Sequence, residues 1–183
     1  MRTMIYFTAV SLDGFIAGPG GELDWLFSSG DYGYTPFYET VDCLVMGRKT
    51  WDTVRSFEGS YPHPGKPAYV FTHQAAQAIA PREPVPEFQP ITQDPTAFVR
   101  YLKSQSGGGI WLVGGGQIAG VLERAGLIDR LVLSIHPVTL GGGARLFAEL
   151  GAGLSGAPSR QDWRLEQKEI FPDGLVQLTY EKG

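Results

Sequence analysis

The sequence predicts an α/β fold around a mixed, mostly parallel sheet, and three features support this prediction. Apolar strand-like runs alternate with helical patterns along most of the chain, which is typical of parallel β-α units. The first run, MIYFTAVSL at residues 4–12, lacks clean polar alternation, as expected of a strand buried on both faces. Near the C-terminus, Pro172-Asp173-Gly174 joins the runs 163–170 and 175–180, which predicts an antiparallel hairpin.

Length and composition predict one globular domain over residues 1–183. Hydrophobic residues make up 43% of the chain and charged residues 19%, as in globular proteins. The net charge of −4 argues against a nucleic-acid surface, which is usually basic. Cys43 is the only cysteine, which excludes an intrachain disulfide and a cysteine-rich zinc site. The N-terminal run is too short and too polar for a signal peptide or membrane span, so we expect a cytoplasmic protein without membrane partners.

The first part of the chain is expected to hold two strands and two helices. After the first strand, the Gly-rich loop at residues 18–24 is either a lid over a site or a plain surface connection. A serine or aspartate within residues 28–31 can cap a short helix that ends near Val41. The apolar run 43–46 follows as a short buried strand, and Gly47 separates it from a helical segment at residues 48–54.

The rest of the chain alternates strands and helices up to the final hairpin. A loop rich in Gly and Pro precedes a strand at residues 68–72, and a further short strand is expected at 85–89. Asp94-Pro95-Thr96 opens a helix through Ser104, because proline is favoured in the first helical turn. A strand at 110–113 leads through glycines into a helix at 117–124, and the partly alternating run 127–138 predicts a long strand.

Two glycine motifs each join a buried strand to the start of a helix. Gly114-Gly115-Gly116 follows one strand, and Gly47 precedes Arg48-Lys49-Thr50 after another. Glycines leave the backbone N–H groups of a helix start accessible, and the helix dipole favours an anion there. The glycines therefore form either a phosphate site or a turn that permits close packing. Cations are unfavourable at a helix N-terminus, so Arg48 and Lys49 are explained by a bound anion, or else form a solvated pair.

Several segments together resemble a known superfamily. Met46-Gly47-Arg48-Lys49-Thr50-Trp51 and Leu112-Val113-Gly114-Gly115-Gly116 resemble the paired cofactor motifs of dihydrofolate reductases, and AVSLDGFIA at residues 9–17 resembles their first strand and mobile loop. Ser11-Leu12-Asp13-Gly14 and the run LGGGARLF at residues 140–147 resemble the C-terminal reductase domain of the riboflavin-biosynthesis protein RibD. The chain is therefore similar, over nearly its whole length, to the RibD C-terminal-domain branch of the dihydrofolate-reductase-like superfamily.

This resemblance implies a three-layer α/β/α fold, a homodimer, and NADPH bound across the carboxyl ends of the strands. Gly47, Arg48, Lys49 and Thr50 would hold the 2′-phosphate and pyrophosphate, and Thr72 would contact the adenine side. The implied pyrophosphate contacts are Gly115, Gly116, Gln117 and Ile118, with Val113 beside them. The implied nicotinamide contacts are Thr8, Ala9 and Ile16.

Two acids are candidate catalytic residues. By resemblance, Asp31 matches the acidic residue that contacts the pterin in dihydrofolate reductases, although it also suits a helix cap. Asp13 ends the first strand near the expected nicotinamide, or serves only as a turn-former in Asp-Gly. Hydride reduction also needs a proton, for which Tyr32 and Tyr34 are further candidates. No metal site is expected, because His63, His73 and His136 lack ligand spacing and are interpreted as structural.

The favoured hypothesis is an NADPH-dependent reductase of a small planar heterocycle. By resemblance, its activity would be like that of a 5-amino-6-(5-phosphoribosylamino)uracil reductase of riboflavin biosynthesis, or like that of a dihydrofolate reductase. The alternative is an NADP(H)-binding module without turnover, such as a sensor or a ligand-sequestering protein. Residues 30–42 motivate this alternative, because they contain no Arg or Lys where RibD domains carry basic residues for the substrate phosphate.

Overall fold

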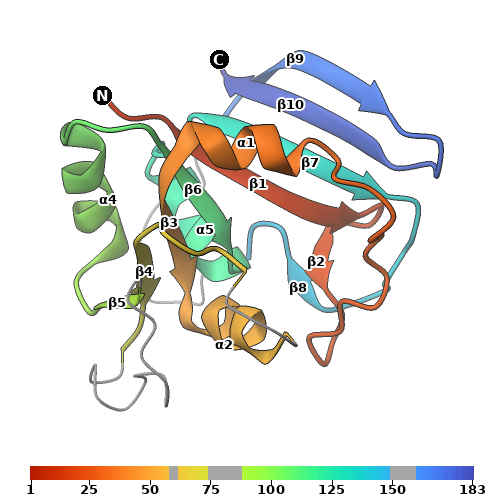
Figure 1. Ribbon diagram of the computed structural model, residues 1–183, viewed down its shortest axis with the longest axis horizontal. Coiled ribbons are helices and arrows are strands. Elements are labelled where there is room, and N and C mark those ends of the chain that lie inside the picture. Colours follow the sequence, from red (N-terminus) through yellow and green to blue (C-terminus); the bar gives the residue numbers. More distant parts are fainter. Residues whose placement is uncertain (58–61, 74–87, 149–159) are drawn as a thin grey trace.

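The structure is a computed structural model that describes residues 1–57, 62–73, 88–148 and 160–183 (Figure 1). Its strands are β1 (Met4–Ser11), β2 (Phe15–Ala17), β3 (Val41–Gly47), β4 (Ala68–Phe71), β5 (Phe88–Ile91), β6 (Gly109–Gly114), β7 (Arg130–His136), β8 (Ala144–Arg145), β9 (Trp163–Ile170) and β10 (Val176–Lys182). Its helices are α1 (Tyr34–Thr40), α2 (Arg48–Ser56), α4 (Pro95–Ser104) and α5 (Gly116–Arg124).

Eight of these strands form one mixed sheet in the order β5-β4-β3-β6-β1-β7-β10-β9. The strands from β5 to β7 are parallel to their neighbours, and β10 is antiparallel to both β7 and β9. Strand β1 lies at the centre, where Tyr6 is opposite Leu112 of β6 and Leu131 of β7. The predicted mostly parallel sheet with a C-terminal antiparallel hairpin is therefore confirmed.

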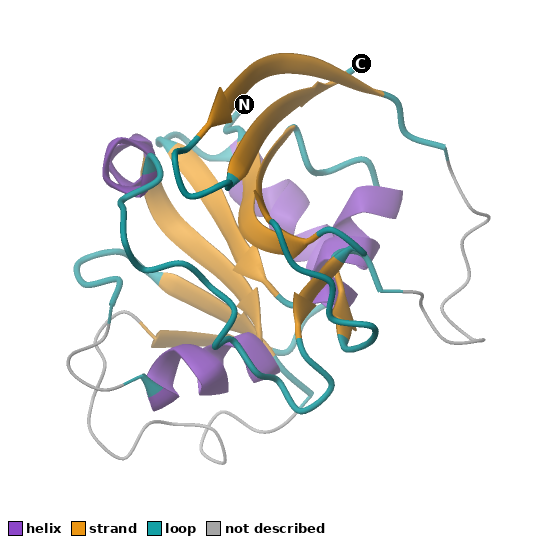
Figure 2. Ribbon diagram, turned by 90° about the vertical axis from the view of Figure 1, so that its right-hand side faces the viewer, coloured by secondary structure: helices purple, strands orange, loops and turns teal. Residues whose placement is uncertain are grey.

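Helices cover both faces of this sheet, which confirms the expected three layers (Figure 2). Tyr6 of β1 points to the face covered by α4 and α5, where it belongs to the same buried cluster as Leu122. Its neighbour Ile5 points to the opposite face and packs in a second cluster with Trp51 of α2 and Trp111 of β6. Residues that alternate along one strand thus supply two separate cores, as expected of a strand buried on both sides.

Some elements differ from their predictions. Helix α1 begins only at Tyr34, because Gly33 and Tyr32 have positive φ angles of 76° and 48° that end the preceding loop. Strands β2 and β8 were not predicted, and they pair with each other in a separate two-stranded sheet. Strand β5 lies slightly later than the predicted strand at 85–89, most of which falls outside the described residues.

Within the described ranges, no helix is long and apolar enough to cross a membrane. The same ranges contain no cluster of three or more His, Cys, Asp or Glu side chains that could hold a metal ion.

Candidate functional site

A cleft of about 1560 Å³ opens at the carboxyl ends of β3, β4, β6, β1 and β7. In Figure 1, α2, β2 and β8 lie toward these strand ends. All of the predicted cofactor contacts line this cleft, although they come from distant parts of the chain. They are Thr8, Ala9, Ile16, Gly47, Arg48, Lys49, Thr50, Thr72, Val113, Gly115, Gly116, Gln117 and Ile118. The fold thus brings these residues together, while their binding of a cofactor stays a prediction.

The two glycine motifs meet in the cleft. Gly115 has a φ angle of 96°, which strongly favours glycine, and it is the N-cap residue of α5. A Cβ atom at Gly115 would lie 3.2 Å from Oγ1 of Thr50 and 3.5 Å from the backbone nitrogen of Gly47. The starts of α2 and α5 therefore approach each other closely, and glycine at position 115 permits this approach.

Gly116 has a different role from Gly115. A Cβ atom at Gly116 would overlap the carbonyl oxygen of Arg145, and the carbonyl of Gly116 accepts a hydrogen bond from the N–H of Ala148 at 3.0 Å. This glycine therefore allows the segment around β8 to pack on the start of α5. Close packing explains Gly116, and the left-handed turn explains Gly115.

Both helix starts are suited to an anion. The N-caps of α2 and α5 are Gly47 and Gly115, and neither helix has a side-chain cap for its first N–H groups. Arg48 projects from the first turn of α2, where its Nε lies 2.8 Å from both carboxylate oxygens of Asp52. We call the two motifs, Gly47 to Thr50 and Gly114 to Ile118, the glycine half of the cleft.

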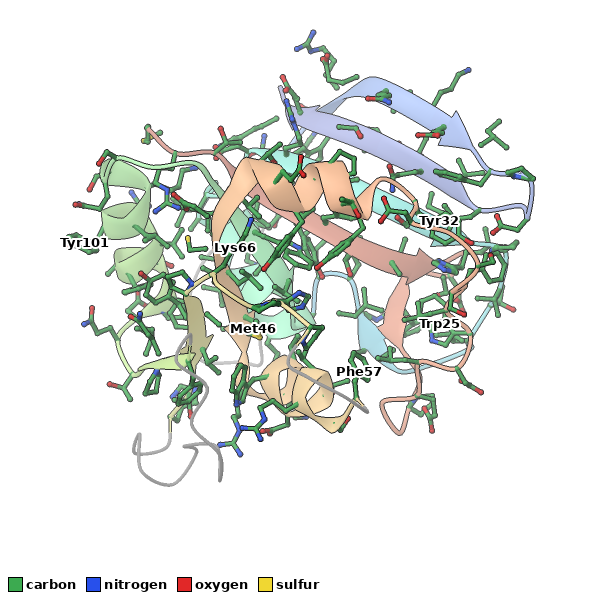
Figure 3. The ribbon with its side chains drawn as sticks, viewed as in Figure 1. Trp25, Tyr32, Met46, Phe57, Lys66 and Tyr101 are labelled. Carbon is green, nitrogen blue, oxygen red and sulfur yellow. The ribbon has the colours of Figure 1, made fainter. Side chains whose placement is uncertain are left out.

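The remaining wall of the cleft is aromatic. We call Phe7, Phe27, Tyr32, Tyr34 and Trp111 the aromatic half. The Trp111 indole is held by a hydrogen bond from Nε1 to the carbonyl of Phe7 at 3.0 Å, and the Tyr34 ring packs edge-on against it at 5.7 Å between centroids. Figure 3 shows Tyr32 on the segment between β2 and α1, on the same side of the molecule as Trp25. Flat rings on these walls suit a planar ligand.

Asp31 borders the aromatic half and also caps α1. Its exposed carboxylate lines the cleft and accepts hydrogen bonds from the N–H of Thr35 at 3.1 Å and from the Thr35 hydroxyl at 2.7 Å. Both interpretations of Asp31 from the sequence are thus compatible with its position, and a catalytic role stays a prediction.

Asp13 lies outside the cleft lining, in a position that fits the turn-forming role that the sequence also allowed, and its catalytic role stays a prediction. Its carboxylate accepts hydrogen bonds from the Ser11 hydroxyl at 2.6 Å and from the backbone N–H groups of Leu140 and Gly141 at 3.1 and 2.7 Å. These bonds, the Ser11 bond first, lower the pKa of Asp13 to about 2. At neutral pH this carboxylate therefore has no proton to donate, and it anchors the loop before β8.

The tyrosine candidates have hydrogen-bond partners. The Tyr32 hydroxyl donates to the carboxylate of Asp173, and this bond raises the pKa of Tyr32. The Tyr34 hydroxyl lies 3.0 Å from Nδ1 of the buried His63. Burial raises the pKa of Tyr34 to about 12 and lowers the pKa of His63 to about 4, so both groups are neutral at neutral pH.

Sequence reasoning missed several residues of the cleft, among them Ser134 and His136 of β7. In the sheet, Ser134 is opposite Ala9, and His136 is opposite Ser11. His136 is buried between the rings of Trp25 and Phe27, with centroids 5.1 and 5.0 Å away, and burial lowers its pKa. The polar positions of β7 were visible in the sequence, but only the pairing of β7 with β1 places them in the cleft.

The chain is similar to a known protein family and to a bacterial relative. The family model for the RibD C-terminal domain matches residues 2–175. The uncharacterized protein YwjB of Bacillus subtilis (strain 168) is 36% identical over 152 residues, which cover 81% of this chain and 84% of YwjB.

Three solved structures are similar over essentially the whole chain. A Shewanella sp. PV-4 protein named for riboflavin biosynthesis shares 30% identity, with a TM-score of 0.80 and coverage of 100% of this chain and 99% of its own. The Thermotoga maritima diaminohydroxyphosphoribosylaminopyrimidine deaminase/5-amino-6-(5-phosphoribosylamino)uracil reductase shares 16% identity, with a TM-score of 0.70 and coverage of 100% and 57%. Dihydrofolate reductase from Enterococcus faecalis, in complex with NADP(H), shares 17% identity, with a TM-score of 0.64 and coverage of 99% and 96%. At these lower identities the last two comparisons establish a common fold.

Proposed function

Because the chain belongs to the RibD C-terminal domain family, we propose that it is an NADPH-dependent reductase of a small planar heterocycle. One observation carries this proposal: two uncapped helix starts converge in a cleft whose opposite wall is aromatic. Family membership supports an oxidoreductase of the riboflavin-pathway type, and the NADP(H) complex of the Enterococcus enzyme supports a nicotinamide cofactor.

The residues of the glycine half fit NADPH. The cleft, at about 1560 Å³, exceeds the roughly 300–1,000 Å³ of ordinary small-molecule pockets, as a dinucleotide together with a substrate requires. Gly115 has no side chain where one would fill the space beside Thr50, and the first turns of α2 and α5 offer N–H donors to phosphate groups. When bound, NADPH would supply a hydride from its nicotinamide ring.

Each part of the cleft then has a task. Arg48, Lys49 and Thr50 bind the 2′-phosphate, whose charge explains two cations at a helix start. The turn before α5 binds the pyrophosphate through backbone N–H groups. The other proposed cofactor contacts are Thr72 on the adenine side, Thr8, Ala9 and Ile16 around the nicotinamide, and Val113 beside the pyrophosphate turn.

The aromatic half would bind and protonate the substrate. Asp31 accepts hydrogen bonds from ring N–H groups and so fixes the orientation of the heterocycle. Tyr34 lines this wall, with its hydroxyl 3.0 Å from Nδ1 of His63, and is the proposed proton donor. Because burial raises its pKa to about 12, Tyr34 gives up this proton only as negative charge develops on the atom next to the one that receives the hydride. The rings of Trp111 and Phe7 exclude water from this transfer.

The decisive experiment is titration of the purified protein with NADPH, with tryptophan fluorescence as the measured signal. We expect saturable quenching and an increase of about tenfold or more in the NADPH Kd for Arg48→Ala, because a charge-assisted bond is lost. Arg55→Ala is the matched control, since Arg55 lies on the same helix but outside the cleft lining. NADH lacks the 2′-phosphate, so its Kd should be the same in both variants. Absence of saturable quenching, or an equal NADPH Kd in Arg48→Ala and wild type, would refute the cofactor assignment.

Turnover separates a reductase from a binding module. NADPH oxidation is measured against dihydrofolate and against aminouracil precursors of riboflavin. Oxidation that depends on one of these heterocycles supports the reductase, whereas tight NADPH binding with no oxidation favours the module without turnover. The homodimer expected from the resemblance is also part of the proposal, and light scattering of the purified protein tests it.

A further inference from the structure

One segment, residues 22–42, forms much of the aromatic wall and contributes a carboxylate but no cation to it. It contributes to the cleft the residues Leu23, Leu26, Phe27, Asp31, Tyr32 and Tyr34. It contains five acidic residues and no Lys, Arg or His. The acidic residues are Glu22, Asp24, Asp31, Glu39 and Asp42. Of these, Asp31 lines the cleft, whereas Asp42 pairs with Arg2 at the amino ends of the strands. A sixth carboxylate, that of Asp173, accepts the hydrogen bond of the Tyr32 hydroxyl.

Two of the cations of the cleft, Arg48 and Lys49, lie in the glycine half, and the third, Arg145, stacks on Phe15 of β2. Among the described residues that line the cleft, the lysines and arginines are Arg48, Lys49 and Arg145. Arg48 and Lys49 begin α2, and the Arg145 carbonyl packs against Gly116 while its guanidinium lies 5.1 Å from the Phe15 ring centroid. Arg82 is the one lysine or arginine of the sequence outside the described ranges.

The neutral polar groups of the aromatic half do not supply positive charge. Burial lowers the pKa of His136, so its ring is neutral at pH 7, and its Nδ1 lies 3.1 Å from the Ser134 carbonyl. The Ser134 hydroxyl accepts a hydrogen bond from the Gln177 amide at 3.0 Å. A phosphate group carries about −1.5 to −2 charges at pH 7 and needs cations or converging N–H donors. Next to Asp31 it would meet charge of its own sign.

From this distribution of charge we infer that the substrate is a planar heterocycle without a phosphate group, with N–H donors that face Asp31. The inference rests on the proposed function and narrows its substrate class. It also separates this protein from the Thermotoga enzyme, whose name specifies a phosphoribosylamino substrate. Repulsion by like charge is a common means of rejecting a ligand of otherwise suitable shape.

The test uses one pair of compounds that differ only in the phosphate: 5-amino-6-(5-phosphoribosylamino)uracil and its dephosphorylated form. At saturating NADPH we expect kcat/KM to be at least about tenfold higher for the dephosphorylated compound. Asp31→Asn should reduce this preference to about threefold, because one negative charge is removed. Glu39→Gln is the matched control, since it removes the same charge from α1 outside the cleft lining, and it should leave the preference unchanged.

A second measurement does not need turnover. Tryptophan fluorescence, recorded without NADPH, gives the Kd of each of the same two compounds. Tighter binding of the dephosphorylated compound supports the inference even if NADPH oxidation fails and the proposed function is lost. Tighter binding of the phosphorylated compound, or binding of neither, overturns the inference even if NADPH binds normally.

Discussion

The two ends of the parallel sheet use charged residues in opposite ways. At the amino ends, buried cations are neutralised by carboxylates that belong to the fold. At the carboxyl ends, cations and helix starts face a cleft instead. A buried cation therefore depends on its carboxylate partner, whereas a cation on a cleft wall can also contact a ligand.

The cations of the amino-end ion pairs are buried, while their carboxylates Asp129 and Asp42 are 33% and 46% exposed. Lys103 is 3% exposed, and its Nζ lies 2.5 Å from the carboxylate of Asp129 and 3.0 Å from the carbonyl of Leu127. Asp129 also accepts the N–H of Met4 at 2.7 Å, which ties the start of β1 to this pair. Arg2, also buried, pairs with Asp42. By contrast, the ion pair of Arg48 at the cleft joins two residues of one helix, with side chains 32% and 53% exposed.

The largest expected effect comes from breaking an amino-end pair. Asp129→Asn leaves Lys103 buried without its carboxylate, which should lower the free energy of unfolding by about 3 kcal/mol. Urea denaturation at pH 7 measures this change. The NADPH Kd should stay within about twofold of wild type, because the pair lies at the far end of the sheet.

Asp162→Asn is the control for that variant, because it removes a carboxylate from a pair with Arg160 in which both side chains are mostly exposed. This variant should lower the free energy of unfolding by less than about 1 kcal/mol. Equal losses in the two variants would contradict the distinction between a pair with a buried cation and an exposed pair.

The second prediction concerns His63, a buried group near the cleft that is held neutral. Its folded-state pKa of about 4 lies below the unfolded value of about 6.5, so the unfolded chain binds the proton more tightly. Stability should therefore be complete above about pH 6.5 and fall by roughly 2–3 kcal/mol as the pH drops to about 4. Urea midpoints across this range test the slope.

Two variants identify the source of that slope. His63→Gln should make it clearly shallower between pH 6.5 and 4, with the remainder due in part to His136, whose pKa burial also lowers, whereas His73→Gln, at an exposed position, should leave it as in wild type. A slope in His63→Gln as steep as in wild type would show that His63 does not cause it.

The third prediction tests the packing of the cleft floor. Gly116→Ala should lower the free energy of unfolding by about 1–3 kcal/mol. The new methyl group overlaps the Arg145 carbonyl and so displaces the loop before α5. It should also weaken NADPH binding, since the pyrophosphate turn shifts. Gly142→Ala is a control in the loop before β8, where a Cβ atom would meet only Pro19 at 3.7 Å. Equal stability and NADPH affinity of the two variants would contradict the packing role.

The smallest effect is expected at Asp13, which acts at a distance. Asp13→Ala frees Leu140 and Gly141, so the loop that packs on Gly116 is held less well and the NADPH KM should rise about fivefold. Because Asp13 does not transfer a proton, kcat should stay within about twofold. Asp13→Asn keeps one acceptor oxygen and should partly restore the KM. A fall in kcat that matches the rise in KM would support a catalytic role for Asp13.

Much of the fold could be predicted because its signals are local. The helix predicted from Asp94 to Ser104 is confirmed as Pro95–Ser104, since the Asp94 carboxylate caps the N–H of Ala97 at 2.8 Å and Pro95 suits the first turn. The hairpin at Pro172-Asp173-Gly174 is also confirmed, since its turn is formed by neighbouring residues, and the N–H of Gly174 donates to the carbonyl of Phe171 at 3.0 Å. Strands β2 and β8 carry no such signal, because two or three residues become a strand only when a distant partner is present.

Part of the candidate site could also be predicted from local signals. The glycine half can be recognised in the sequence, because turn glycines and helix starts are made by neighbouring residues. The position of Asp13 is not, since its partners Leu140 and Gly141 follow 127 and 128 residues later. The same holds for Ser134 and His136, which reach the cleft only through the register of β7 against β1.

By itself, therefore, the sequence determined the alternation of strands and helices, the terminal hairpin and the two glycine motifs, because backbone conformation and capping depend on adjacent residues. Tertiary structure alone decided that Gly116 is a packing residue, that Asp13 anchors a loop, and that the wall opposite the glycines is aromatic, with Asp31 beside it. Those properties depend on which atoms from distant segments come into contact, and contacts of that kind are fixed only when the sheet assembles.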